Sequence, residues 1–345
     1  MSSNALNAPK AALITITKSE SFYLTDGDIV LFSLPKDNVV TAFRVDRVFL
    51  RRSSPVLEGM LALPSSKDVE LYDNVPLIKL QDETEHLTMF LNALYDPGCL
   101  PWKKHDADTV RTVEGILLLA NKYEADHLRK RIIDLLERDW PSELSDWDIN
   151  EAELAVKAES GTFRTKNSIL DPCEAIRLAR KCDVPSILPA AFYYLSSIQG
   201  VSDRHLPDSL EKILSKGSGL GIAGFSLLSA EDLRCLLVGR DAILHLFRDY
   251  FREADGKVRS YIKHSNLDHE DCQRRWRRFE DGLRLEVLHY DIDPLLVMKR
   301  DTDSFEVRCL AERPCDHCLE EFFSSLSRNR EILWEQLPSL FMLDS

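Results

Sequence analysis

The sequence predicts an α+β fold, in which a short mixed sheet with surrounding helices is followed by a mainly α-helical C-terminal region. Three observations lead to this expectation. Short β-rich runs bounded by turn residues lie between residues 28 and 80. Apolar residues at helical spacing prevail after residue 87, and strand signals become sparse beyond Pro141. The order of the elements is not a regular β-α-β alternation, which favours α+β over α/β.

The strand signals begin behind an N-terminal tail, residues 1–20, which ends in an extended piece at Ala12–Thr17. Asp28–Phe32 is apolar and β-rich, and Val39–Val45 resumes this pattern after the turn-forming segment Pro35–Asn38. Two β-rich runs around a Pro/Asp/Asn turn predict a β-hairpin.

Helices are expected to surround this sheet and to complete a domain over residues 21–140. Apolar residues at helical spacing define them, together with Ser-Pro, Pro-Gly and Trp-Pro pairs that start or stop helices. In chain order, the expected elements are a helix from Arg47 to Leu50, a second helix from Pro55 to Leu61, a strand at Val75–Leu80, a helix at Leu87–Leu94, and a helical hairpin formed by Val110–Ala120 and Leu128–Leu136.

Two helical regions, residues 141–255 and 256–345, are expected to follow. A sequence motif that occurs twice (called the echo below), a capping box and an apolar stripe predict the helices of these regions. These features are the echo of Leu119–Glu124 in Leu178–Asp183, the box at Ser229–Asp232 with a helix through Phe247, and the stripe from Leu319 to Leu337 that ends at Pro338. In the charged segment 255–312, helix is favoured over strands near 285–290 and 305–309.

Composition and charge limit the classes of partner and the cellular location that we expect. The 345 residues carry a net charge of -13, which argues against nucleic acid or anionic membranes as general partners. We expect no secretory signal and no membrane span, because no apolar run approaches the ~18 residues that a span needs. The eight cysteines are scattered and are expected to be reduced thiols. The expected location is therefore cytoplasmic or nuclear.

One ordered set of residues resembles a known family. The set comprises Asp28–Leu31, Phe43, Val45, Asp46, Arg47, Phe49, Leu50, Ser54, Pro55 and Met60, followed by Leu118–Ala120, Lys122, Tyr123 and Leu128. In this order and spacing it resembles the BTB/POZ domain over about residues 21–140, a third of the chain. The stretches Leu188–Tyr193 and Trp334–Pro338 are similar to those of BTB-containing proteins expanded in fungi.

The resemblance implies a protein-interaction adaptor that forms a homodimer and docks protein partners. Those partners would be a cullin-type ubiquitin ligase or a transcription-linked or scaffolding complex. It also implies that Asp28 and Arg47 form a charged pair at the dimer interface, although two partly exposed and merely tolerated side chains are the alternative. The interaction residues expected on this basis are Asp28, Phe43, Asp46, Arg47 and Met60.

Two departures from the family pattern affect these expectations. Asp46 stands where the family usually has His, which changes the surface of the groove. Cullin-binding members tend to carry an apolar-x-Glu motif after the helix that ends in Met, whereas Leu61–Lys67 contains no Glu. The second departure favours a scaffolding complex over a cullin.

A metal-binding protein is the alternative from a different class. Cys315 and Cys318, with Cys309 upstream, have a C-x-x-C spacing that suits zinc. A fourth ligand would have to come from His289, Cys272 or His317, none at a characteristic spacing. The competing interpretation is that these thiols continue the apolar stripe of the last helix as buried side chains.

Other motifs give no support for catalysis or a cofactor. Arg274–Arg278 combines four guanidinium groups with Trp276, as a nucleic-acid contact does, but neighbouring acidic residues also explain it as a solvated helix. Gly219–Gly224 matches a dinucleotide pattern without the strand that must precede it, so a linker is expected. No nucleophile elbow, zinc-protease helix or phosphate loop is present. The sequence therefore predicts a non-enzymatic protein without a cofactor.

Overall fold

The computed structural model describes residues 14–62, 70–101, 103–159, 171–197, 224–264, 271–279, 293–299 and 314–343. The chain divides into two units, residues 1–103 with 108–135, and residues 104–107 with 136–345. The α+β class is confirmed, because the first unit holds a five-stranded sheet and the described part of the second unit contains helices without strands.

The sheet has the strand order β1-β3-β2-β5-β4 and is mixed. The predicted hairpin is confirmed, since β2 and β3 pair in antiparallel register, whereas β1 runs parallel to β3 and β5 runs parallel to β2. The strands are β1 Thr15–Tyr23, β2 Ile29–Phe32, β3 Val39–Val45, β4 Leu71–Tyr72 and β5 Val75–Lys79.

Two-residue Asp-Asn turns close both antiparallel pairs of the sheet. Asp37 and Asn38 have φ values of 51° and 61°, and Asp73 and Asn74 have φ values of 49° and 62°. Positive φ at both central residues is the type I′ geometry that matches the twist of a hairpin, and Asp and Asn tolerate it better than most residues. The first turn was expected, whereas the second turn and the short β4 were not.

Strand β1 corrects the expected tail. Residues 15–20 belong to the sheet, because Thr15–Lys18 pair with Val39–Ala42 of β3. The register then shifts before Tyr23 pairs with Arg44, so the strand carries an irregularity along the edge of the sheet. Most β1 side chains are exposed, which explains why no periodic burial pattern extended the predicted piece to Tyr23.

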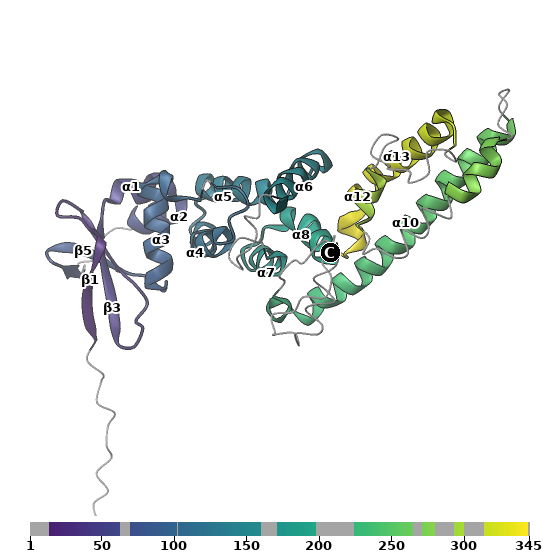
Figure 1. The fold of residues 1–345 in the computed structure, drawn as a ribbon. Helices are drawn as coiled ribbons and strands as arrows, with labels where there is room; N and C mark the ends of the chain where they lie inside the picture. The colour runs from purple at the N-terminus through teal and green to yellow at the C-terminus, as the bar shows by residue number, and fades with distance from the viewer. Residues whose placement is uncertain are drawn as a thin grey trace, which may run out of the picture. The chain divides into compact units, whose positions relative to one another are not determined.

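The predicted helices of the first unit are confirmed, and α1, α2 and α3 lie on one side of the sheet (Figure 1). All four residues of β2 are buried, which explains its continuous apolar run. The helical elements are α1 Arg47–Ser53, α2 Pro55–Ala62, α3 Thr84–Tyr95, the short 3-10 helix η1 Pro97–Cys99, α4 Thr109–Lys122 and α5 Asp126–Asp139.

In the second unit, α10 and α13 lie side by side (Figure 1). The capping box is confirmed, because Ser229 Oγ accepts from the N–H of Asp232 (3.0 Å) and donates to its carboxylate (2.6 Å). The helices are α6 Leu144–Glu159, α7 Pro172–Cys182, η3 Pro185–Ile187, α8 Leu188–Ser197, η4 Phe225–Leu227, α10 Ala230–His264, a helix over residues 271–279, α12 Pro294–Met298 and α13 Asp316–Leu340.

The sequence echo is a repeated helix end. After α4, the N–H of Ala125 donates to the carbonyl of Ala120 (2.8 Å), and after α7 the N–H of Val184 donates to the carbonyl of Ala179 (2.9 Å). The residues before these donors, Glu124 and Asp183, have φ values of 51° and 53°. This is the left-handed helix cap, and the predicted second helical pair α7–α8 follows from it.

The two C-terminal helical regions form one unit, because the expected boundary at residues 255 and 256 falls inside α10. An ion pair formed by a buried arginine also connects them. Arg330 donates to the carboxylate of Asp148 (2.9 and 2.5 Å) and to the carbonyl of Leu295 (2.8 Å). Its side chain is only 8% exposed, so α6, α12 and α13 share one core.

Three further expectations differ from the structure or lie outside it. Pro338 lies inside the last turn of α13 and does not end the helix, which continues to Leu340; its missing N–H removes one hydrogen bond of that turn. Helix α10 continues beyond Phe247 to His264. The segments 285–290 and 305–309, and the Gly219–Gly224 motif apart from Gly224, lie outside the described residues.

Candidate functional site

The expected charged pair is present at the start of α1. The Asp28 carboxylate accepts a hydrogen bond from the backbone N–H of Arg47 (2.6 Å) and lies 3.9 Å from Nε of the same residue. Asp28 therefore satisfies one of the free N–H groups at the start of the helix. The side chains of Asp28 and Arg47 are 57% and 33% exposed, so in a single chain the pair is only partly buried.

The guanidinium group of Arg47 is incompletely satisfied. Nη2 donates to the carbonyl of Asp28 at 3.4 Å, a long contact. Nε is shielded from solvent and makes no hydrogen bond to any residue that the structure describes. A shielded donor without an acceptor costs about 1–3 kcal/mol.

Two apolar side chains are exposed directly after Arg47. Val48 is 54% exposed and Phe49 is 45% exposed, whereas Leu50 is buried. The Phe49 ring stacks on Tyr95 of α3, with ring centroids 4.6 Å apart and an angle of 22° between the planes. The stack fixes one face of Phe49 and leaves the other open. We call Asp28, Arg47, Val48 and Phe49 the α1 surface.

Asp46 holds the ring beneath Phe49. The Tyr95 hydroxyl accepts from the N–H of Asp46 (2.9 Å) and donates to its carboxylate (3.2 Å). Burial raises the pKa of Tyr95 to about 12, so this hydroxyl stays a donor at neutral pH. Asp46 thus positions the Tyr95 ring that supports Phe49.

The other two expected interaction residues lie elsewhere. Phe43 in β3 is fully buried, so its side chain packs in the core and is absent from the surface of the chain. Met60 in α2 is half-buried. The expected interaction residues include neither Val48 nor Phe49, although Phe49 belongs to the set that resembles the family. The signal was available, because a helix as short as α1 can turn few of its consecutive apolar residues inward.

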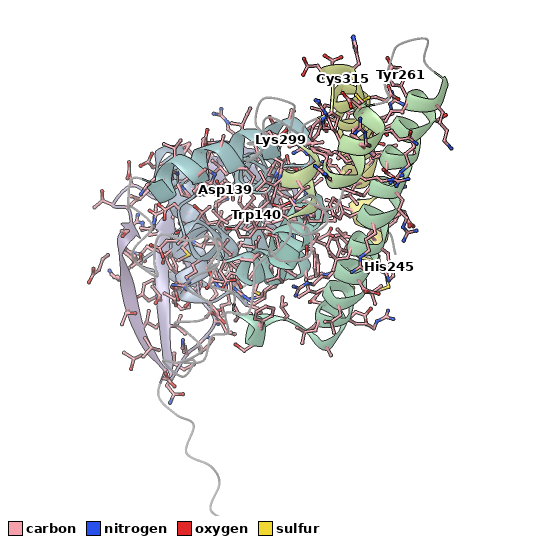
Figure 2. The ribbon with its side chains drawn as sticks, turned by 45° about the vertical axis from the view of Figure 1, so that its right-hand side comes forward. Asp139, Trp140, His245, Tyr261, Lys299 and Cys315 are labelled. Atoms are coloured by element: carbon pink, nitrogen blue, oxygen red, sulfur yellow. The ribbon has the colours of Figure 1, made fainter. Side chains whose placement is uncertain are left out.

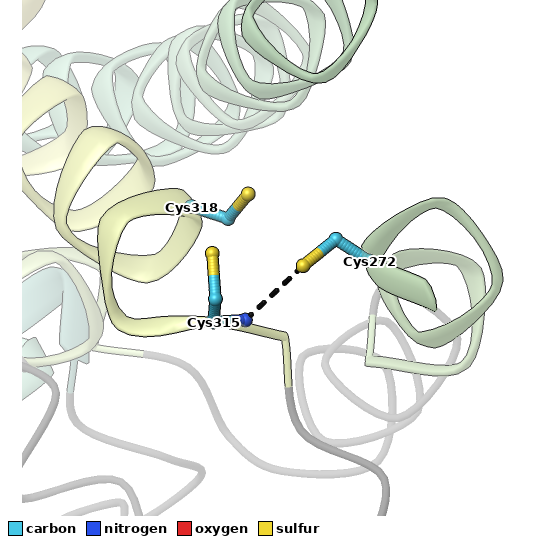
Figure 3. Close-up of side chains that lie close together, drawn as sticks. All are labelled: Cys272, Cys315 and Cys318. Carbon is cyan, nitrogen blue, oxygen red and sulfur yellow. Dashed lines mark hydrogen bonds between the residues drawn. The ribbon is translucent and has the colours of Figure 1, made fainter. Parts of the chain in front are cut away.

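The second candidate site is a cluster of three thiols in the second unit, Cys272, Cys315 and Cys318. Their sulfur atoms all lie within 4.8 Å of one another (Figure 3). Cys315 precedes the first residue of α13, and Cys318 lies in the first turn. Cys315 and Tyr261 of α10 lie near the same end of the α10–α13 pair (Figure 2). The three-cysteine cluster therefore brings together the helix over residues 271–279 and the start of α13, which are distant in sequence.

The helix over residues 271–279 holds Cys272 in place. Cys272, Trp276 and Phe279 are its buried residues at helical spacing. The Trp276 ring lies 5.3 Å from that of Phe322 in α13, and its Nε1–H donates to Asp255 in α10 (2.7 Å). The aromatic of the Arg-rich segment is thus 2% exposed and is unavailable for stacking on a base.

The thiols of the cluster differ in acidity. Burial alone would raise the pKa of Cys315, but hydrogen bonds from the Cys318 backbone N–H and from neighbouring thiols outweigh burial and lower it. Burial raises the pKa of Cys272 and of Cys318. The backbone N–H of Cys315 also donates to the sulfur of Cys272 (3.4 Å; Figure 3). Cys315 is therefore the thiol that ionises most readily.

The structure changes the expected ligand set. It brings Cys272 to the C-x-x-C pair across 43 residues of sequence. Cys309 and His289 lie outside the described residues. The His317 side chain is 67% exposed and lies 3.7 Å from Glu320, so it is not a member of the cluster.

Comparison of the chain with models of protein families and with curated protein sequences gave no match. Among the helices of the described residues, none has the length and apolar composition required to cross a bilayer. Function is therefore inferred from the geometry of the α1 surface and of the three-cysteine cluster.

Proposed function

We propose that this protein is a protein-interaction adaptor that dimerises through the α1 surface of a BTB/POZ-like domain and docks other proteins. The observation that carries the proposal is the exposure of Val48 and Phe49 directly beside the Asp28–Arg47 pair. The α+β architecture of the first unit and the confirmed hairpin and helices support the resemblance to that family.

The α1 surface has the composition of an interface centre. Fully burying a Val or Phe side chain contributes about 1.5–3 kcal/mol. In a two-fold dimer each contact occurs twice, so the contribution of one copy is doubled. An aromatic anchor such as Phe49, already fixed on Tyr95, loses little conformational entropy when a partner covers it.

The charged pair favours a partner with a hydrogen-bond acceptor. Covering Asp28 and Arg47 removes water from both, which is unfavourable unless further hydrogen bonds form. The Arg47 side chain is 33% exposed, so the solvent-facing N–H groups of its guanidinium are the donors available for such a bond. A second copy would bring the same residues, with their carboxylate and carbonyl oxygens, into the interface, because a two-fold interface is formed by the same surface of both copies.

The experiment is light scattering after size-exclusion chromatography of the full-length protein and three variants. Val48→Asp and Phe49→Asp place a charge in the interface and are expected to give monomers. Leu71→Asp is the matched control, because Leu71 is a similarly exposed apolar residue (57%) in the edge strand β4 and outside the α1 surface, and this variant is expected to remain dimeric. Thermal unfolding checks that every variant is folded. Dimeric Val48→Asp and Phe49→Asp proteins would contradict the proposal.

The partner class is tested separately. We propose a scaffolding or transcription-linked complex ahead of a cullin-type ubiquitin ligase, since Leu61–Lys67 contains no Glu. The test is co-elution with the N-terminal domain of a fungal cullin at tens of micromolar, roughly where an interface of ordinary affinity is populated. Absence of a complex supports a scaffolding or transcription-linked partner, and a stable complex makes a cullin the preferred one.

A further inference from the structure

We propose that Cys272, Cys315 and Cys318 bind one zinc ion, which fastens the helix over residues 271–279 to the start of α13. The proposal is independent of dimerisation, because all three residues belong to the second unit. It rests on the convergence of the three sulfur atoms shown in Figure 3.

The spacing of the sulfur atoms suits zinc. With Zn–S bonds of about 2.3 Å in a tetrahedral site, two sulfur ligands lie about 3.8 Å apart. The three sulfurs of the cluster lie within 4.8 Å of one another. Binding therefore requires a contraction of about 1 Å at most, which rotation of cysteine side chains supplies without moving the helices.

The backbone prepares the cluster for thiolate ligands. Cys315 stands at the start of α13, where the backbone N–H groups and the helix dipole favour negative charge. The N–H of Cys315 itself points at the sulfur of Cys272 (3.4 Å). Such N–H···S contacts are the outer-shell bonds that orient and stabilise thiolates around a metal. Each thiol that binds zinc releases its proton to solvent.

The chemistry favours zinc over a disulfide. A disulfide joins two sulfurs and leaves the third unused, whereas a zinc ion uses all three and keeps a fourth position for water or another donor. Cys272, Cys315 and Cys318 are not joined by a disulfide in the structure. Soft thiolates also select zinc over the oxygen-preferring Mg²⁺ and Ca²⁺.

Zinc would add to contacts that already hold the helix over residues 271–279. Trp276 and Phe279 pack on Phe322, one and two helical turns beyond Cys272. Cys272 lies one turn before Trp276 on the same face, so a Cys272–Zn bond fixes the N-terminal end of this helix. The ion therefore acts as a structural clamp between two segments that are distant in sequence.

The test is a titration of the full-length protein, stripped of metal under reducing conditions, with Co²⁺ and then Zn²⁺. Co²⁺ bound to three thiolates gives sulfur-to-cobalt charge-transfer absorption in the near ultraviolet and intense tetrahedral bands in the visible. We expect one Co²⁺ per chain, displaced by one equivalent of Zn²⁺, with a higher unfolding temperature when zinc is bound.

Variants identify the ligands. Cys272→Ser is expected to weaken zinc binding more than about tenfold, since even changes next to metal ligands reach that size. Cys99→Ser, at an exposed cysteine of the first unit, is the control and should bind as the wild type does. Absence of stoichiometric cobalt binding by fully reduced wild-type protein would overturn the proposal even if Cys272→Ser failed to fold. Unchanged binding by a folded Cys272→Ser protein would overturn it equally.

Discussion

Ser54 and Tyr123 are joined by a buried hydrogen bond across 69 residues of sequence. The Ser54 hydroxyl donates to the carbonyl oxygen of Tyr123 and accepts from the backbone N–H of Leu57 (2.9 Å). The Tyr123 hydroxyl in turn donates to Asp82, whose carboxylate also receives Lys122 Nζ at 2.5 Å. The start of α2, the end of α4 and the segment before α3 are therefore linked by one polar network.

Replacing Ser54 with Ala is expected to destabilise the protein by about 1–3 kcal/mol. The change removes the N-terminal cap of α2 and leaves the buried Tyr123 carbonyl without its donor. Ser53→Ala is the control, because the Ser53 hydroxyl bonds only to the exposed carbonyl of Phe49 among the described residues. Urea denaturation measures the free energy of unfolding of both variants. An equal loss of stability in Ser54→Ala and Ser53→Ala would contradict a special role for Ser54.

Two glycines of α10 are expected to respond oppositely to Ala. A Cβ at Gly239 would lie 2.0 Å from Cδ1 of the buried Phe341 ring, so Gly239→Ala should cost about 1–3 kcal/mol or more. A Cβ at Gly256 meets no described atom within 4 Å, so Gly256→Ala should stabilise the helix by about 0.5–1 kcal/mol. Thermal unfolding compares them, and a shift of the same sign for both would refute the close approach of α10 to Phe341.

The stability of the second unit is expected to fall as the pH rises through the titration of Glu151. Burial, reinforced by the charges of Asp293 and Asp148, raises its pKa from 4.5 to about 7, although Lys299 acts in the opposite direction. The folded protein therefore binds this proton more tightly than the unfolded chain does. The stabilisation is complete below about pH 4.5 and is lost by about pH 7.

Glu151→Gln tests this sign, because Gln resembles the protonated acid. The variant is expected to be more stable than the wild type at about pH 8, by roughly 1–3 kcal/mol, and similar to it at about pH 4.5. Glu153→Gln is the contrasting control on the same helix. The hydrogen bond from Lys104 lowers the pKa of Glu153, so its removal should give no gain at about pH 8. The free energy of unfolding of each protein at both pH values tests this prediction. A Glu151→Gln protein that is less stable than the wild type at about pH 8 would contradict the raised pKa of Glu151.

Local chemistry explains which elements could be predicted from the sequence. The Asp37–Asn38 turn, the Ser229 cap and the helical apolar stripes each encode their structure within a few residues. Strand β4 was missed because two residues give no periodic pattern, although Asp73-Asn74 repeats the signal of the first turn. Local signals of this kind extend over about one element.

The candidate sites depend on contacts that sequence spacing does not encode. Cys272 joins the C-x-x-C pair only because Trp276 and Phe279 turn the same helical face toward α13. Phe43 matched a family position, but only the paired register of β2 and β3 shows that it is a core residue. Tertiary packing therefore determined which of the singled-out residues are exposed.

Dimerisation through the α1 surface is the central claim, and sedimentation equilibrium of the full-length wild-type protein tests it most directly. Dimerisation through this surface predicts a mass twice that of the 39.5 kDa chain at about micromolar concentration. It also predicts that Val48→Asp returns the mass to that of one chain. A wild-type protein that remains a single chain up to tens of micromolar would contradict the account, whatever partners the protein docks.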